Sequence, residues 1–131
     1  MKAYLTDTNF WLRFLLADDE VLSNKARMII EKSRREKRSL ILLGEVIMEM
    51  VYVLDKVYGY SRVEISKTML ALMGGVEVNV RDGKVWEMVF RNYVDLKLDL
   101  VDIFLVKKAK EEGYVLATFD KKMMGLMGEK N

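Results

Sequence analysis

The sequence predicts an α/β fold, a three-layer α/β/α sandwich with a central, mainly parallel sheet, in a single domain of residues 1–131. Short apolar runs alternate with longer segments of helical periodicity, and this order is typical of a parallel sheet covered by helices. The length allows one well-formed core but not two. The four predicted strands are residues 2–6, SLILL at 39–43, VEVNV at 76–80 and YVLAT at 114–118.

Helices are predicted in each interval between these strands. A short first helix is indicated by apolar residues at helical spacing, namely Phe10, Trp11, Phe14 and Leu15. Asp18 or Asp19 can cap a second helix that continues to about Arg38. The third, Glu45 to Tyr58, is so apolar that we expect it to be buried on most of its surface.

The second half of the chain shows clearer helix boundaries. S-R-V-E at 61–64 is a capping box that opens a helix. Another helix is predicted from Asp82 to about Val94. Asp99 can cap a further helix to Glu112, which Gly113 would end as a C-cap residue. A short helix follows the last strand.

Composition excludes several classes of site. The chain has no cysteine and no histidine, which rules out disulfides, zinc-thiolate sites and catalytic triads that need either residue. The net charge of +2 gives no general reason to bind nucleic acid. We see neither a signal-peptide core nor an apolar run long enough to cross a membrane, so we expect a cytoplasmic protein.

Four acidic residues stand where a predicted strand ends or a helix begins. They are Asp7, Glu49, Asp102 and Asp120. Because the carboxyl ends of parallel strands meet at one edge of a sheet, we expect these side chains to converge there. Carboxylates that lie together repel one another unless a cation separates them. The predicted cation is Mg²⁺ or Mn²⁺, which prefer oxygen ligands.

Each acid also has a simpler interpretation. Asp7, Asp99, Asp102 and Asp120 could be ordinary helix caps. Glu49 interrupts an apolar run, where an unpaired buried carboxylate is costly, so we expect a metal, a basic partner or a cleft beside it. Its simpler interpretation is a salt bridge or an exposed edge of the helix. Glu45 shares its helix face and could be a first-turn acid. Asn9 and Thr118 could orient the carboxylates by hydrogen bonds, or could be turn residues.

Two groups of basic residues could contact phosphates. Residues 25–38 contain seven bases and two acids, a pattern that also fits a solvated helix face. Five lysines lie closer in sequence to the acids and are the better candidates for binding a nucleic-acid backbone: Lys107, Lys108, Lys110, Lys121 and Lys122. Four methionines could exceed what one small core buries, which would favour a dimer: Met48, Met50, Met69 and Met73.

Four motifs, in order, resemble the PIN-domain nucleases, and most closely the VapC-type toxins of toxin–antitoxin pairs. They are T-D-T-N near the start, E-M-V-Y-V-L before Y-G-Y-S, L-D-L-V-D-I-F-L-V-K-K-A, and A-T-F-D near the end. The resemblance covers nearly the whole chain. It places the family's metal-binding acids on Asp7, Glu49, Asp102 and Asp120, an accessory acid on Asp99, and polar supports on Asn9 and Thr118.

The resemblance implies Mg²⁺- or Mn²⁺-dependent cleavage of RNA. In-line attack by a metal-bound hydroxide would not use the RNA 2′-OH, so we expect products with 5′-phosphate and 3′-hydroxyl ends. The resemblance also implies a homodimer and a small antitoxin partner. Three alternatives stay open. One is a PIN-like module that binds RNA or protein without cutting. Another is a housekeeping RNA-processing nuclease. The last is a phosphatase with Asp7 as nucleophile, although Asn9 stands where such sites usually have a second acid.

Overall fold

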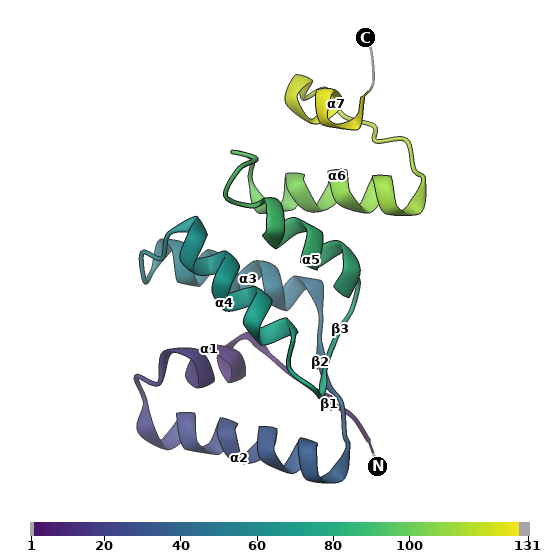
Figure 1. Cartoon of the computed structure of the whole chain (residues 1–131). Coiled ribbons are helices and arrows are strands. Elements are labelled where there is room, and N and C mark those ends of the chain that lie inside the picture. The colour runs from purple at the N-terminus through teal and green to yellow at the C-terminus, as the bar shows by residue number, and fades with distance from the viewer. Residues whose placement is uncertain (1, 129–131) are drawn as a thin grey trace.

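The computed structural model describes residues 2–128 and confirms the predicted α/β fold class (Figure 1). Within these residues the sheet has three strands, β1 (Tyr4–Leu5), β2 (Leu40–Leu42) and β3 (Val78–Val80). They lie in the order β1-β2-β3 and all pair in parallel, with Tyr4 opposite Leu40 and Leu42 opposite Val80. β2 is therefore central, and its Leu40 and Leu42 are buried.

The described part of the chain contains seven helices. Their bounds are α1 (Thr8–Leu16), α2 (Glu20–Glu36), α3 (Gly44–Lys56), α4 (Arg62–Met73), α5 (Gly83–Asn92), α6 (Leu100–Glu112) and α7 (Lys121–Met127). The predicted caps explain several of these bounds. Asp19 accepts a hydrogen bond from the Leu22 N–H, and Ser61 and Glu64 form the predicted capping box. Gly113 ends α6 with a positive φ of 73°, which glycine adopts without steric cost.

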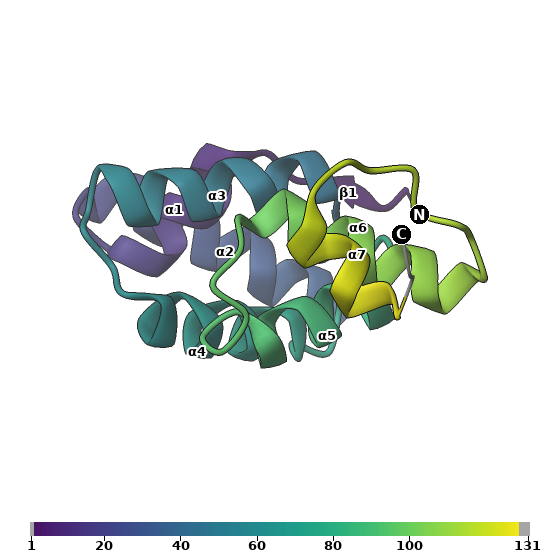
Figure 2. The same ribbon diagram turned by 90° about the horizontal axis from the view of Figure 1, so that it is seen from above.

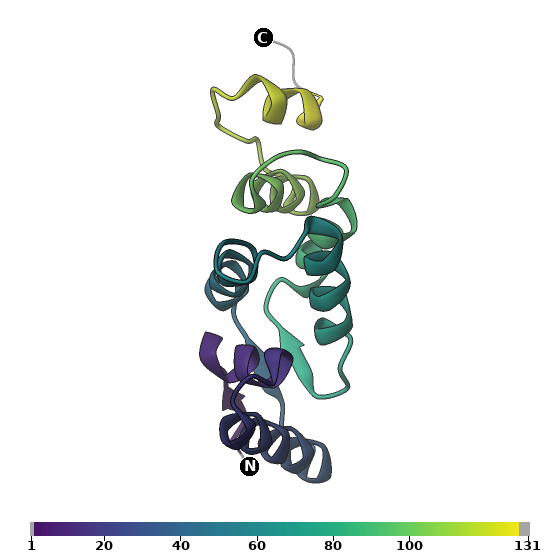
Figure 3. The same ribbon diagram turned by 90° about the vertical axis from the view of Figure 1, so that its left-hand side faces the viewer.

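The helices lie on two sides of the molecule. Seen from above, α1 and α3 run along one side and α4 and α5 along the other (Figure 2). The view from the left-hand side shows the same division and also shows that the molecule is elongated (Figure 3). In Figures 1 and 3, α2 lies at one end and α7 at the other. No helix of residues 2–128 has both the length and the hydropathy that a membrane span requires.

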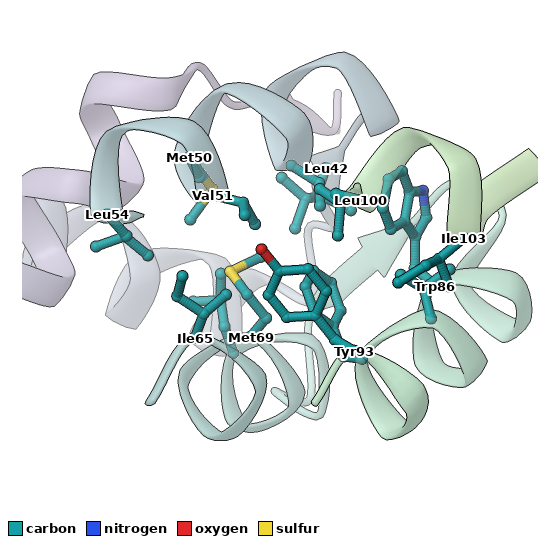
Figure 4. Packing of buried hydrophobic residues seen from close by; sticks show 14 of the residues in the cluster. Leu42, Met50, Val51, Leu54, Ile65, Met69, Trp86, Tyr93, Leu100 and Ile103 are labelled. Carbon is teal, nitrogen blue, oxygen red and sulfur yellow. The ribbon is translucent and has the colours of Figure 1, made fainter. Parts of the chain in front are cut away.

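The core forms where α3, α4, α5 and α6 meet β2 (Figure 4). It includes Leu42, Met50, Met69, Trp86 and Ile103, each essentially without solvent exposure. Met48 and Met73 are half-buried and pack against the same core. The four methionines that suggested a dimer are thus accommodated within one chain, so they give no argument for a second copy.

α6 is fixed to this core by aromatic stacking. The rings of Trp86 and Phe104 lie 4.5 Å apart at an interplanar angle of 29°. Trp86 also packs closely on the start of α3, because a β-carbon built on Gly44 would lie 3.3 Å from Trp86 Nε1. A larger residue at position 44 would therefore push on the indole that supports α6.

One prediction about the elements is wrong. Residues 114–118 do not form a fourth strand, because in this chain no neighbouring strand pairs with them. A strand is defined by its partner, and the chain runs away from the sheet after α6 (Figure 1). Most residues of α3 are buried or half-buried, as predicted, but Glu45, Glu49 and Tyr52 form an exposed stripe along it.

Candidate functional site

Asp7 lies at the carboxyl end of β1, as the sequence predicts. Its side chain is exposed, and its Oδ1 accepts a hydrogen bond of 2.8 Å from the Phe10 N–H. Asp7 is therefore the N-cap of α1, which confirms the simpler interpretation of this residue. The cap uses Oδ1, and no hydrogen bond to Oδ2 is found among residues 2–128. Capping α1 and binding a ligand are compatible roles.

Buried polar residues hold the end of β1 in place. The Thr6 hydroxyl donates to the Ile41 carbonyl over 2.6 Å, and it accepts from Trp11 Nε1 over 2.7 Å. These bonds connect β1 with β2 and with α1, directly before Asp7 in the chain. From the sequence this role of Thr6 was missed, and Trp11 was used only as an apolar residue at helical spacing. The available indication was a threonine at the end of a strand with a tryptophan five residues later.

Glu49 lies on the exposed stripe of α3, one turn after Glu45. Because its carboxylate faces solvent, it carries no burial cost that a metal or a basic partner would have to offset. The predicted burial of Glu49 is therefore wrong and its alternative, an exposed edge of the helix, is confirmed, so the residue is accessible to a ligand. Its apolar neighbours Met50 and Val51 are buried on the opposite face of the helix.

Asp99 and Asp102 lie at the start of α6. Asp99 occupies the N-cap position, but its side chain makes no capping hydrogen bond and is exposed. Asp102 is in the first turn and is half-buried. The start of α6 lies against α3, and the two helices share a hollow whose lining includes Met48, Tyr52, Asp55, Asp99 and Val101.

Arg62 fixes the loop before α6. Its guanidinium donates to the carbonyls of Tyr93 over 2.8 Å and Leu98 over 2.7 Å, and it lies 4.1 Å from the centre of the Tyr93 ring. Burial raises the pKa of the Tyr93 hydroxyl, while the nearby Arg62 acts in the opposite direction. Arg62 thus positions the two acids of α6 indirectly, a role that the capping-box motif around it did not indicate.

Asp120 and Thr118 lie at the other end of the chain. Asp120 Oδ1 accepts from the Met123 N–H over 2.9 Å, so Asp120 is the N-cap of α7. The Thr118 hydroxyl accepts from the Asp120 backbone N–H over 3.1 Å and donates to Met123 Sδ over 3.9 Å. Thr118 therefore acts as a turn residue, and within residues 2–128 its hydroxyl makes no hydrogen bond to the Asp120 carboxylate. Asn9 is exposed on α1, and within residues 2–128 its side chain makes no hydrogen bond to Asp7.

The predicted acids are not brought together in one chain. No group of three or more carboxylates within residues 2–128 is placed to hold a metal ion. Asp7 follows β1, whereas Asp120 precedes α7 at the far end of the molecule (Figures 1 and 3). The residue types suit Mg²⁺ or Mn²⁺, but their arrangement in a single chain does not form a site for either ion.

Several of the predicted basic residues have local partners. Lys108 Nζ lies 2.8 Å from Asp82 and 3.3 Å from Glu112, and these bonds raise the pKa of Lys108. Burial, together with Lys110, lowers the pKa of Lys107. Lys122 Nζ donates to the Lys97 carbonyl over 3.4 Å. These contacts favour structural roles for Lys108 and Lys122 over phosphate binding.

The end of the basic segment 25–38 is also structural. Arg38 lies 4.0 Å from the centre of the Tyr4 ring and donates to the Lys2 carbonyl over 2.6 Å. It therefore joins the end of α2 to the start of β1. Other bases of α2, including Lys25 and Arg34, are exposed.

Comparison with known proteins gives one match. A family model described as the PIN domain matches residues 4–125, which is nearly the whole chain. PIN domains are generally metal-dependent nucleases that act on nucleic acid. A search of curated proteins and a search of solved structures found no match.

Proposed function

Since this chain belongs to the PIN-domain family, we propose that it is a divalent-metal-dependent endoribonuclease. The proposed metal ligands are Asp7, Glu49, Asp102 and Asp120, with Asp99 as an accessory acid and with Asn9 and Thr118 as polar supports. The proposed ion is Mg²⁺ or Mn²⁺. The lack of histidine and cysteine supports an all-oxygen ligand set, which suits these hard cations.

The observation that carries this proposal is the position of Asp7. It is an exposed carboxylate at the carboxyl end of a strand in a parallel sheet, the edge where α/β folds place their ligand sites. The buried contacts of Thr6 with Ile41 and Trp11 hold that strand end rigidly. A ligand group supported in this way is already oriented before metal or substrate arrives.

The finer proposal is the toxin of a toxin–antitoxin pair, which acts in the cytoplasm as a homodimer and is inhibited by a small antitoxin protein. The order and spacing of the four motifs support it. A housekeeping RNA-processing nuclease is the alternative within the same chemistry. Expression of the chain alone should arrest growth if it is a toxin, and co-expression of the protein encoded by the neighbouring reading frame should relieve the arrest. Normal growth at high expression of active enzyme would favour the housekeeping nuclease.

Cleavage of a mixed RNA pool by the purified chain tests the proposed activity. We expect cleavage with Mn²⁺ and none with EDTA. Asp7→Asn should lower the rate by roughly 100-fold or more, because it removes a charged metal ligand. Glu49→Gln, Asp102→Asn and Asp120→Asn should have effects in the same direction.

The chain offers a matched control for the Asp7 variant. Asp19 caps α2 by the same kind of bond that Asp7 makes at α1, with Oδ1 accepting from the third following N–H. Asparagine caps helices about as well as aspartate does, so both variants should fold normally. Asp19→Asn should cleave RNA at the wild-type rate. An equal loss of cleavage rate in the two variants would show that helix capping, and not metal ligation, explains the effect of Asp7→Asn.

A second candidate is a PIN-like module that binds RNA or protein without cutting. The observation that favours it is the separation of the carboxylates within residues 2–128. RNA binding by the folded protein, with no cleavage under any divalent metal, would support this module and contradict the nuclease.

A further inference from the structure

The sheet of this chain ends at β1 with an unused edge. Tyr4 and Thr6 donate their backbone N–H groups towards β2, to Ser39 and Ile41. Because successive residues of a strand alternate, the N–H and C=O of Leu5 point to the opposite, free edge. The Leu5 side chain is 70% exposed there. A hollow follows this part of the chain, lined by Tyr4, Leu5, Thr6, Asp7, Phe10 and Ile29.

The same chain contains an extended segment without a partner. Residues 115–119 make no backbone hydrogen bond to any other residue of 2–128. Val115, Ala117 and Phe119 are all exposed, and the two larger side chains reach 86% for Val115 and 101% for Phe119. These alternate residues form one apolar face, as in a strand, and Tyr114 and Val115 are residues that favour strands.

The two features complement each other but lie apart in one molecule. The segment turns away from β1 after α6, and α7 packs on α6 with Met123 buried (Figures 1 and 3). A second copy can bring its segment to the free edge while α6 and α7 keep this packing. The exchange is reciprocal, since each copy offers one edge and one segment, and this gives a closed two-fold dimer.

We propose that residues 114–119 of a second copy add to the free edge of β1 as a parallel strand, and that this exchange places Asp120 of one copy beside Asp7 of the other. The other strand pairs of the sheet are parallel. Parallel addition brings the carboxyl ends of both strands to the same edge of the sheet. An aspartate that caps the following helix comes directly after each strand: Asp7 caps α1 and Asp120 caps α7.

The dimer accounts for the separation of Asp120 from Asp7 in a single chain. Asp120 is a ligand supplied by the other copy, so one chain alone holds an incomplete site. It also covers the exposed row of Val115, Ala117 and Phe119 and satisfies the backbone of an exposed strand edge. The strand exchange stands independently of activity, whereas the role of Asp120 in the site of the other copy rests on the proposed function.

Cross-linking tests the strand exchange without reference to activity. The chain has no cysteine, so introduced thiols are the only ones present. Leu5→Cys combined with Ala117→Cys, treated with a short bismaleimide, should give a covalent dimer. The control combines Val76→Cys with Ala117→Cys, because Val76 is 84% exposed but precedes β3 at the other edge of the sheet. A cross-linked monomer, no cross-link, or equal dimer yield in the control would overturn the exchange.

Mixing inactive variants tests the shared site. Asp7→Asn and Asp120→Asn, refolded together in equal amounts, should recover about a quarter of the wild-type cleavage rate, because random pairing leaves one intact site in each mixed dimer. Asp7→Asn mixed with Glu49→Gln should stay inactive, since both acids belong to the same copy. Cross-linked dimers without this recovery would overturn the shared site. Cross-linked dimers of a wild-type chain that does not cleave RNA would instead contradict the nuclease.

Discussion

Trp11 Nε1 donates a hydrogen bond of 2.7 Å to Thr6 Oγ1, and this buried contact fixes the strand end from which Asp7 projects. The Thr6 hydroxyl in turn donates a hydrogen bond to the Ile41 carbonyl of β2. One hydroxyl therefore aligns β1, β2 and α1 next to the proposed site. An acid at the end of such a short strand would otherwise have little to hold it in place.

Thr6→Val should lower the free energy of unfolding by about 1–3 kcal/mol, because it leaves the buried Trp11 N–H and the Ile41 carbonyl without this partner. Thr6→Ser keeps the hydroxyl and should lose less. Urea denaturation of the two variants measures the difference. Equal losses would mean that the threonine methyl group matters and the hydrogen bonds do not.

Phe104→Ala should destabilise the fold by about 2–4 kcal/mol, because it removes the ring that stacks on Trp86 and joins α6 to the core. Leu105→Ala is the matched change at the next residue, which is exposed, and should cost at most about 0.5 kcal/mol. Thermal unfolding followed by circular dichroism compares them. A similar loss in both would show that α6 contributes helix propensity rather than packing.

Arg62→Lys should lower the free energy of unfolding by about 1–3 kcal/mol. Lysine cannot donate to the carbonyls of Tyr93 and Leu98 together while it also lies on the Tyr93 ring. The control is Arg91→Lys at an exposed ion pair with Glu87, where we expect at most about 0.5 kcal/mol. Chemical denaturation of both variants measures these changes in the free energy of unfolding. A loss at Arg91 equal to that at Arg62 would contradict the anchoring role of Arg62.

The capping box of α4 makes stability depend on pH. Hydrogen bonds with Ser61 lower the pKa of Glu64 below its usual value. A lowered pKa in the folded state gives stability that is present above the unfolded pKa and is lost as pH falls through the folded pKa. Glu64→Gln should therefore flatten the decline of stability in acid. Identical acid denaturation profiles of wild type and variant would contradict this assignment.

The capping bond itself has a separate, pH-independent test. Ser61→Ala should cost about 1 kcal/mol at neutral pH, because it removes the acceptor of the Glu64 N–H. Ser61→Asn keeps a capping side chain and should cost less. Denaturation midpoints at neutral pH measure both, and equal costs would mean that Ser61 does not act as a cap.

Local patterns predicted most of the fold. The structure confirms three of the predicted strands, the helices, and the caps at Asp19, Ser61 and Gly113. These features depend on residues that are close in sequence. Residues 114–118 have the composition of a strand but not its structure, because pairing depends on a distant partner that local sequence does not specify. The free edge of β1 is the other half of that missing pair.

The candidate site was predicted in part. Asp7 and Asp120 stand at a strand end and a helix start as expected, and each caps the following helix. The sequence could not reveal that Glu49 is exposed, since only the packing of α3 decides which of its faces is buried. The supporting contacts of Thr6 and Arg62 reach residues more than thirty positions away, and no short motif encodes such distances.

The most direct test of the proposed metal site is calorimetric titration of Mn²⁺ into the wild-type protein, Asp7→Asn and Asp19→Asn. The account predicts saturable binding to wild type and to Asp19→Asn, and its loss in Asp7→Asn, because Asp7 is a proposed metal ligand and Asp19 is not. Equal Mn²⁺ binding by Asp7→Asn, or no saturable binding by a wild-type protein that cleaves RNA, would contradict it.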